Sequence, residues 1–337
     1  MISIVTAVFN EEEVIERFHQ EIVGVMESLK EPWEIIYVDD GSRDKSLPLL
    51  LRYQKADPRV TILELSRNWG HQSALTAGLA RAAGSAVVLI DSDLQDPPSV
   101  IPELVRAWKS GAQVVIGERG RRAESGLRKV LFLGFYRVLG YLSDFPIPLN
   151  AGIFGLLDRG VADEILRLSE SNRYLPGLRA WVGFRTEVVS YDRAARAAGK
   201  PKQTFWKLLK YALDAIFSFS YKPLRLSLVL GVTAGALALA LAVSLVVCRF
   251  AGVGLFGNPV VAGYTSTISA GLFLGAVQLF CIGVLGEYVG RIYDEVKRRP
   301  LYLVNQIHSA FSHEGERRIA AVGRERGHPL ILGARDE

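Results

Sequence analysis

The stretch Ala86-Val87-Val88-Leu89-Ile90-Asp91-Ser92-Asp93-Leu94-Gln95-Asp96-Pro97-Pro98 sets an apolar run directly before three aspartates. A short run that is apolar without alternation is typical of a strand buried in the middle of a sheet. Asp91 and Asp93 come where this strand ends. Two carboxylates this close repel each other without a cation, and their oxygens are the ligands that Mg²⁺ and Mn²⁺ prefer. The stretch therefore predicts a buried strand with a divalent-metal site at its carboxyl end.

The third carboxylate of the stretch, Asp96, is followed by Pro97 and Pro98. Proline suits the first turn of a helix, because its missing N–H would have no partner there in any case. We therefore expect Asp96 to cap a helix that begins at these prolines, outside the metal-binding pair.

Four further short runs have the composition of strands, and helix-length segments separate them. They are Ile2–Phe9, Glu34–Asp40, Val60–Ser66 and Gln113–Gly117. Strands that alternate with helices predict an α/β domain with a mostly parallel, Rossmann-like sheet, which we assign to residues 1–200. Ligands of such sheets bind beyond the carboxyl ends of the strands, so the polar residues found there are the candidates for chemistry.

A second acidic pair, Asp39-Asp40, ends another of these strands and precedes Gly41-Ser42. One of the two carboxylates could accept a hydrogen bond from a nucleobase imide or a ribose hydroxyl, while Gly41 permits a turn. The alternative is an ordinary turn with a helix capped by Ser42 or Asp44. Convergence with Asp91 and Asp93 at one crevice favours the binding role.

The chain of 337 residues is 49% hydrophobic, which exceeds an ordinary soluble composition. Two segments, at about 224–247 and 262–285, are almost continuously apolar and long enough to cross a bilayer as helices, so we expect a transmembrane hairpin over 224–290. Gly231-x-x-x-Gly235 and Gly271-x-x-x-Gly275 let helices approach closely, either within the hairpin or in a homo-oligomer.

Basic residues fix the expected orientation of the hairpin. The loop between the spans holds only Arg249, whereas both flanks are basic, with Lys202, Lys207, Lys210, Lys222 and Arg225 before the first span and Arg291, Lys297, Arg298 and Arg299 after the second. By the positive-inside rule the α/β domain and the tail over 291–337 are cytoplasmic. The absence of a basic leader or cleavage site at the N-terminus agrees with this, and the tail is expected to be partly flexible from about Ser312.

Residues 201–223 repeat apolar side chains at helical spacing with lysines on the other side, which predicts an amphipathic helix at the membrane interface. A helix packed on the α/β domain has the same pattern. The segment Val130–Leu142 has the same two interpretations, a membrane-interface helix or a helix packed on the domain.

The net charge of +5 is too modest to indicate a nucleic-acid partner. Cys248 and Cys281 lie in apolar surroundings and are expected to be inert.

Gly252-Val253-Gly254-Leu255-Phe256-Gly257 matches the glycine spacing of a dinucleotide-binding loop. It follows a membrane segment instead of a strand and would face away from the cytosol, so we reject that function. The turn after the first strand, Phe9–Glu13, contains no glycine. Phosphates bound there must be neutralised by another device, which the metal pair provides.

Five motifs together carry a resemblance to a known family over roughly residues 1–308. They are VTAVFNEE at residues 5–12, VDDGS at 38–42, SRNWG at 66–70, DSDLQDPP at 91–98 and GER at 117–119. In this order and spacing they resemble the inverting family 2 glycosyltransferases of GT-A fold. GEYVGR at 286–291 and RPLY at 299–302 resemble the polyisoprenyl-phosphate branch, whose members include GtrB-type enzymes and dolichyl-phosphate mannose synthase.

The resemblance implies roles for named residues. The nucleotide sugar would be bound by Phe9, Glu11, Val38, Asp40 and Asp91; the Mg²⁺ or Mn²⁺ by Asp91, Asp93 and Gln95; and phosphate by Arg119 and Arg128. Apart from the resemblance, basic residues such as Lys202 could draw the acceptor phosphate to the crevice, or they could only satisfy the positive-inside rule and bind lipid headgroups. The sequence departs from the pattern at Ala7, where proline is frequent, and at Gly155, where many relatives carry arginine. Because of the second departure, no acceptor-site or sugar-site role is transferred from the family to the stretch around Gly155.

The implied reaction is inverting transfer of a sugar from a nucleotide sugar to a polyprenyl phosphate such as undecaprenyl phosphate, at the cytoplasmic membrane face. Glucose from UDP-glucose is the first expectation, and GDP-mannose or a UDP-aminoarabinose-type donor are the alternatives. Asp93 and Asp96 are candidates for a general base. A nucleotide-sugar sensor or scaffold and a small transporter are hypotheses from other classes; the spans carry no buried charge apart from Glu287 near one end, which disfavours transport.

Overall fold

A computed structural model describes residues 1–119, 151–171, 173–192, 222–250 and 263–310 of the chain. The chain divides into two compact units. Of the described residues, the first unit holds those up to 192 and those from 298 on, and the second holds those from 222 to 297.

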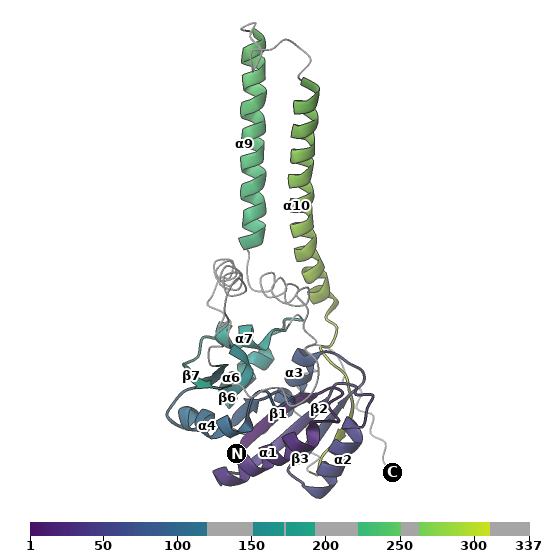
Figure 1. Ribbon diagram of the computed structural model, residues 1–337, viewed down its shortest axis with the longest axis vertical. Coiled ribbons are helices and arrows are strands. Elements are labelled where there is room, and N and C mark those ends of the chain that lie inside the picture. The colour runs from purple at the N-terminus through teal and green to yellow at the C-terminus, as the bar shows by residue number, and fades with distance from the viewer. Residues whose placement is uncertain (120–150, 172, 193–221, 251–262, 311–337) are drawn as a thin grey trace. The chain divides into compact units, whose positions relative to one another are not determined.

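An eight-stranded sheet runs through the described part of the first unit in the order β7-β5-β6-β4-β1-β2-β3-β8 (Figure 1). Its central strands β4, β1, β2 and β3 are parallel, whereas β6 and β8 run antiparallel to their neighbours β4 and β3. The strands are β1 (Ile2–Val8), β2 (Trp33–Asp39), β3 (Val60–Leu65), β4 (Ala86–Leu89), β5 (Val114–Arg119), β6 (Ala151–Asp158), β7 (Thr186–Tyr191) and β8 (Val304–His308). The five strands that we predicted are thus confirmed as β1 to β5, and the mostly parallel Rossmann-like architecture with them.

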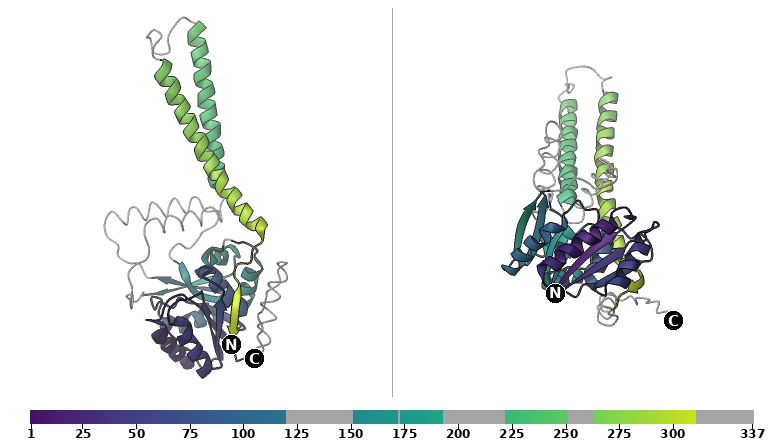
Figure 2. Two further views of the ribbon diagram at one scale, coloured as in Figure 1. Left: turned by 90° about the vertical axis from the view of Figure 1, so that its right-hand side faces the viewer. Right: turned by 60° about the horizontal axis from the view of Figure 1, so that its bottom comes forward.

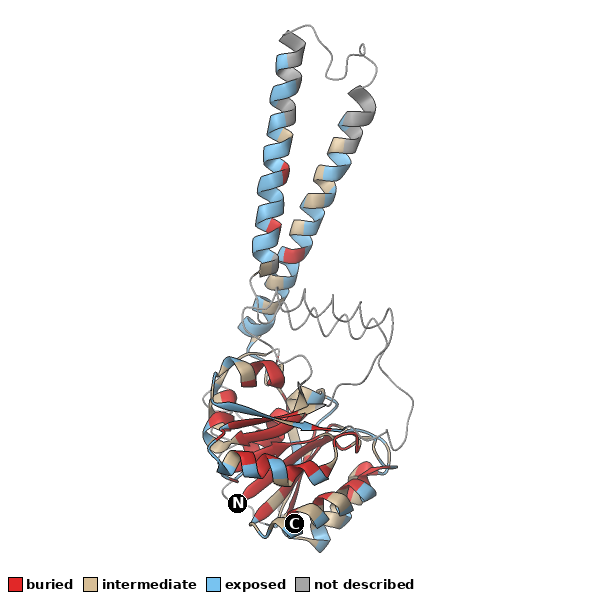
Figure 3. Ribbon diagram, turned by 60° about the vertical axis from the view of Figure 1, so that its left-hand side comes forward, coloured by how far each residue is buried: buried red, intermediate tan, exposed pale blue. Residues whose placement is uncertain are grey.

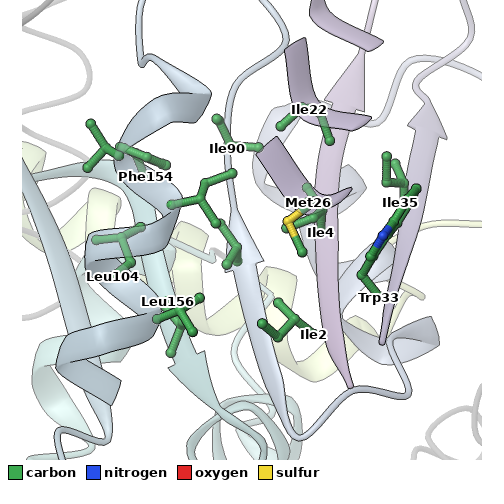
Figure 4. Close-up of a cluster of buried hydrophobic side chains, with 14 of the residues drawn as sticks. Ile2, Ile4, Ile22, Met26, Trp33, Ile35, Ile90, Leu104, Phe154 and Leu156 are labelled. Carbon is green, nitrogen blue, oxygen red and sulfur yellow. The ribbon is translucent and has the colours of Figure 1, made fainter. Parts of the chain in front are cut away.

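Helices cover both faces of this sheet. They are α1 (Ile15–Leu29), α2 (Ser46–Ala56), α3 (His71–Arg81), α4 (Ile101–Lys109), α6 (Arg159–Arg167) and α7 (Leu175–Trp181), with a 3₁₀ turn at Pro98–Val100. On one face Ile22 and Met26 of α1 and Leu104 of α4 pack with strand residues such as Ile4 and Phe154 (Figure 4). On the other face Gly78 lets α3 approach β1, since a Cβ there would lie 2.3 Å from Val5 Cγ1.

The second unit contains two long helices, α9 (Lys222–Phe250) and α10 (Gly263–Lys297). Their described side chains are mostly apolar and exposed (Figure 3). Cys281 Sγ of α10 lies 3.4 Å from the Ser227 carbonyl oxygen of α9. Among the described residues, Ala270–Lys297 has the length and a mean hydropathy of 1.8 that allow it to cross a membrane, while the apolar Leu224–Ala240 is shorter.

After α10 the chain re-enters the sheet of the first unit. Strand β8 pairs with β3, and Ser66 N donates to the Leu303 carbonyl oxygen just before it (2.9 Å; Figures 1 and 2). Within the segment 291–337, which we predicted to be a cytosolic and partly flexible tail, α10 continues to Lys297 and β8 joins the edge of the sheet. The predicted interface helix at 201–223 lies outside the described residues except for positions 222 and 223, which begin α9. The segment 130–142, the loop at 251–262 and the tail from 311 are not described either.

Candidate active site

Four polar segments follow the carboxyl ends of the four parallel central strands. Because β4, β1, β2 and β3 are neighbours in the sheet, these segments lie side by side at one edge. They are Asp91–Pro97, Phe9–Glu13, Asp40–Asp44 and Ser66–Gly70. The four segments that we expected to line the ligand-binding crevice therefore all lie within the described residues.

The segments after β1 and β2 are tied to each other by side-chain hydrogen bonds to backbone N–H groups. Asn10 takes a left-handed φ of 55°, and its Oδ1 accepts from Arg43 N at 2.8 Å. Further bonds run from Asn10 N to Ser42 Oγ (3.1 Å), Glu11 N to Ser46 Oγ (2.8 Å), Glu12 N to Asp44 Oδ2 (3.1 Å) and Lys45 N to Glu12 Oε2 (2.9 Å). Phe9, 41% exposed, is presented at this rigid rim.

Asp40 supports the third wall of the crevice. Its Oδ1 accepts from Trp69 N at 2.7 Å and its Oδ2 from Gly70 N at 3.0 Å, and the side chain is buried. Burial raises the pKa of Asp40 although these two backbone donors oppose the shift. Both of its oxygens thus hold the Ser66–Gly70 segment at the start of α3.

The neighbouring Asp39 has an acceptor to offer. Its side chain is buried; Oδ2 accepts from Ser42 N at 3.2 Å, and Oδ1 is buried without a hydrogen-bond partner among the described residues. Burial raises the pKa of Asp39. A buried carboxylate oxygen with a vacant lone pair is a suitable acceptor for a ligand N–H or O–H. The sequence drew attention to the pair, but assigned binding to Asp40 alone.

The segment after β4 presents Asp91 and Asp93. Asp91 Oδ1 lies 2.9 Å from His71 Nε2, and Asp93 accepts from the backbone and side chain of Gln95 (3.1 and 2.6 Å). Leu94 takes a left-handed φ of 58°, and Ser92 Oγ donates to the Ala7 carbonyl oxygen (3.1 Å), so the segment is held against β1.

His71, the first residue of α3, was missed from the sequence. Burial opposes a positive charge on its ring, but the carboxylates of Asp91, Asp40 and Asp93 together raise the pKa of His71 above its ordinary value. Its position directly after the Ser66–Gly70 motif was the signal that could have found it, since the start of a helix after a parallel strand lies at the ligand-binding edge.

Asp96 is fully buried and accepts a 2.5 Å hydrogen bond from the hydroxyl of Tyr191 in β7. Our expectation that it caps a helix is wrong: Pro97 precedes the 3₁₀ turn and Val100 precedes α4, and neither start has a side-chain cap. The Tyr191 bond explains the difference, because it draws the carboxylate into the domain and away from the backbone N–H groups of the helix.

Of the other predicted site residues, some lie within the described part of the chain and some do not. Val38 is buried within β2, Glu11 is half-buried, and Gln95 is 7% exposed. Arg119 is the last residue of β5 and pairs with Tyr191 through the strand ladder; its side chain, like Arg128 and Lys202 altogether, lies outside what the structure describes.

Asp91 and Asp93 fit a divalent cation. No group of three or more His, Cys, Asp and Glu side chains gathers for a metal within the described ranges. Two carboxylates suffice for Mg²⁺, which usually takes one or two of them and completes its shell with water and substrate phosphate. The donors are hard oxygens, and His71 Nε2 lies 2.9 Å from Asp91 Oδ1 beside them.

Comparison with known proteins covers nearly the whole chain. Residues 3–166 match the family described as Glycosyl transferase family 2, and residues 222–292 match the GtrB C-terminal hairpin. The uncharacterized glycosyltransferase YkcC of Bacillus subtilis is 42% identical over 90% of this chain and 93% of its own length. The SfII prophage-derived bactoprenol glucosyl transferase of Shigella flexneri is 41% identical over 91% of this chain and 98% of its own.

Among solved structures, glucosyl-3-phosphoglycerate synthase from Mycobacterium tuberculosis aligns with 64% of this chain and 77% of its own, at 21% identity and a TM-score of 0.46. The assignment rests on the sequence relatives, which match at high identity over almost their full length. The chain is therefore a glycosyltransferase of family 2 that carries a membrane-associated GtrB-type C-terminal hairpin.

Proposed function

We propose that this enzyme transfers glucose from UDP-glucose to a polyprenyl phosphate, with inversion at the anomeric carbon. The observation that carries the proposal is the meeting of Asp91 and Asp93 with the buried acceptor of Asp39 at one edge of the sheet. The names of the bactoprenol glucosyl transferase relatives favour glucose and a polyprenyl acceptor. A donor with mannose on GDP or an aminoarabinose-type sugar on UDP is the alternative.

In this proposal the nucleoside lies against the rim formed after β1 and β2. Phe9 offers an exposed ring for stacking, and Asp39 Oδ1 accepts from the nucleobase imide. Asp40 does not contact the nucleoside in this proposal. It positions the Ser66–Gly70 segment through its hydrogen bonds to Trp69 N and Gly70 N. Glu11 and Val38 complete the wall.

Asp91 and Asp93, assisted by Gln95, would hold Mg²⁺ or Mn²⁺ against the donor diphosphate. The ion supplies Lewis-acid stabilisation of the departing diphosphate. His71 Nε2 lies beside Asp91, where the neighbouring carboxylates raise its pKa. Arg119, Arg128 and Lys202 are the proposed cationic partners of the donor and acceptor phosphates.

The acceptor needs little activation. A phosphate monoester has its second pKa near about 6 and is mostly a dianion at neutral pH, so its oxygen can attack without a dedicated base. Asp93, which belongs to the proposed metal pair, would serve as the base if one is used. The full burial of Asp96 and its bond to Tyr191 favour a supporting role for that residue.

The hairpin would bring the enzyme to its lipid substrate, whose phosphate stays at the headgroup level. We propose that α9 and α10 both cross the membrane, with the catalytic unit on the cytoplasmic side. This places the basic flanks inside, as the positive-inside rule demands.

Radiolabel transfer tests the reaction. The purified full chain in detergent is incubated with undecaprenyl phosphate and a panel of UDP- and GDP-sugars, with Mg²⁺ or Mn²⁺ and with EDTA. We expect labelled lipid from UDP-glucose and none with EDTA. Nucleotide-sugar binding without transfer from any donor would instead favour the sensor or scaffold.

Cysteine labelling tests the orientation. In a chain whose two native cysteines are replaced by alanine, Gly257→Cys lies in the loop between the spans and Ala310→Cys lies after β8. A membrane-impermeant maleimide applied to intact cells should label only the first. Labelling of Ala310→Cys alone would reverse the proposed orientation.

A further inference from the structure

Arg179 is a buried cation for which the proposed reaction has no use so far. It lies on α7 and is 4% exposed. Its Nη2 donates to the Gly152 carbonyl oxygen (3.2 Å), while its Nε is buried without a hydrogen-bond partner in the described part of the chain. A guanidinium has five N–H donors and no acceptor, and within the described ranges one carbonyl oxygen accepts from it.

Among the described residues, no salt bridge balances the charge of Arg179. Burial lowers the pKa of Arg179 to about 10, which still leaves it protonated at neutral pH, and the partly opposing influence comes from Tyr174 and not from a carboxylate. By contrast Arg159, another largely buried arginine, is paired with Asp163 at 2.8 Å. A buried charge that is not compensated is costly to the fold, and buried groups with a perturbed pKa cluster at functional sites.

Gly155 makes room for this guanidinium. A Cβ at Gly155 would lie 3.0 Å from Arg179 Nη1 and 2.4 Å from the Val115 carbonyl oxygen. The strand β6 therefore has no side chain at the point where Arg179 packs onto it. The lack of a side chain at Gly155 and the burial of Arg179 thus belong to one local arrangement.

The arrangement lies at the ligand-binding edge of the sheet. Since β6 runs antiparallel to β4 and β5, its first residues lie where those strands end, and Ala151 pairs with Glu118, next to Arg119. Helix α7 is also tied to the start of α3, because Leu175 N donates to Gln72 Oε1 (2.8 Å). Gln72 adjoins His71, which contacts Asp91.

We propose that Arg179 binds a phosphoryl oxygen of a bound substrate, and that Gly155 admits it to that position. The proposal rests on the proposed function, in which two phosphoryl groups enter the site. The donor diphosphate and the phosphate of the lipid acceptor share this chemistry, so the test must separate them.

Binding of two probes by the full chain in detergent separates the sources. Calorimetry with UDP and with undecaprenyl phosphate is run on the wild type, on Arg179→Met and on Arg179→Lys, with Arg159→Met as the matched control. Loss of one charge-assisted hydrogen bond should raise one Kd about tenfold. A rise for UDP alone assigns the donor, and a rise for undecaprenyl phosphate alone assigns the acceptor. Lysine should restore part of the loss, and Arg159→Met should bind both probes as the wild type does.

Unchanged binding of both probes would contradict a role of Arg179 in phosphate binding. Folded Arg179→Met that binds both probes with wild-type affinity overturns the proposal, even if its melting temperature has changed. If that variant does not fold, Arg179→Gln, which keeps N–H donors and loses the charge, is judged by the same criterion. A wild type that binds both probes but transfers no sugar refutes only the proposed function, whereas one that binds neither refutes both.

Discussion

Adjacent aspartates at the end of β2 have different tasks. Asp39 offers a buried oxygen without a partner among the described residues, while both oxygens of Asp40 are occupied by backbone donors. Sequence could place the pair at the crevice, because it follows a buried strand. It could not divide the roles, since that division depends on where the Ser66–Gly70 segment folds back.

Asp91 is the residue on which the proposed chemistry depends most. Asp91→Asn keeps the size of the side chain but removes a metal-binding charge, so we expect turnover to fall by roughly 10²–10³-fold. The measurement is the rate of sugar transfer at saturating Mg²⁺. Asp163→Asn, on the exposed face of α6, removes a charge far from the crevice and should leave the rate unchanged. An Asp91→Asn enzyme with full turnover would exclude the metal-dependent mechanism.

His19 should make the fold sensitive to acid. Its Nδ1 lies 2.8 Å from the Tyr37 hydroxyl, and its ring stacks on Tyr53 at 4.1 Å between centroids. Burial lowers the pKa of His19 below 6.5, with Asp57 opposing. The unfolded chain therefore protonates His19 at a higher pH than the folded chain does. The contribution of neutral His19 to the free energy of unfolding is thus complete above pH 6.5 and is lost as the pH falls below that value.

The urea midpoint of the full chain, followed from pH 7.5 down to pH 5 or so, measures this effect. His19→Phe keeps an aromatic ring but cannot titrate. It should lower stability overall, since Tyr37 loses its partner, and it should flatten the dependence on pH. An equally steep dependence in the variant would assign the acid sensitivity to other groups.

At the scale of elements, the strands that follow the βαβ rhythm could be predicted, whereas β6, β7 and β8 were missed. Strand β6 is apolar, with Phe154 and Leu156 buried, but it runs antiparallel to both its neighbours and falls outside that rhythm. Each of β1 to β5 follows the βαβ rhythm, which is local in the sequence. By contrast β7 is mostly exposed, and β8 is made of polar residues such as Asn305 and Gln306. Their pairing partners are remote, so their strand character depends on the assembled sheet and not on their own composition.

The turn after β2 should be intolerant of side chains. Gly41 has a φ of +72°, and a Cβ there would lie 2.7 Å from the Arg67 carbonyl carbon and 2.8 Å from Asn68 N. Gly41→Ala must therefore push the Ser66–Gly70 segment away from Asp40. We expect weaker UDP binding and a loss of stability of at least about 1–2 kcal/mol.

Gly24 provides the matched control, because it lies in α1 and a Cβ added there would meet nothing within 4 Å. Gly24→Ala should bind UDP normally and gain up to about 1 kcal/mol from better helix propensity. Calorimetry with UDP and thermal unfolding of both variants check the pair. Equal UDP affinity in the two would show that the turn does not position the binding segment.

At the scale of the whole molecule, β8 makes the catalytic sheet depend on the part of the chain that follows the hairpin. A chain truncated after Leu303 loses β8 and leaves β3 as an open edge with unpaired backbone groups. It should unfold at a lower temperature and aggregate. A chain truncated after Ala310 keeps β8 and should behave as the wild type. Equal melting temperatures for the two truncations would show that the edge strand contributes nothing.

The same strand sets an order of events during biosynthesis. Thr61 of β3 and Ser309, directly after β8, are bonded at 3.2 Å although 248 positions separate them in the chain. The ribosome must therefore synthesise both hairpin helices before the last strand can join the sheet. Until then β3 lacks its outer partner and is exposed to chaperones or to other nascent chains. The enzyme thus becomes complete only after its own anchor has been made, so catalytic maturation comes after the synthesis of the segment that takes it to the membrane.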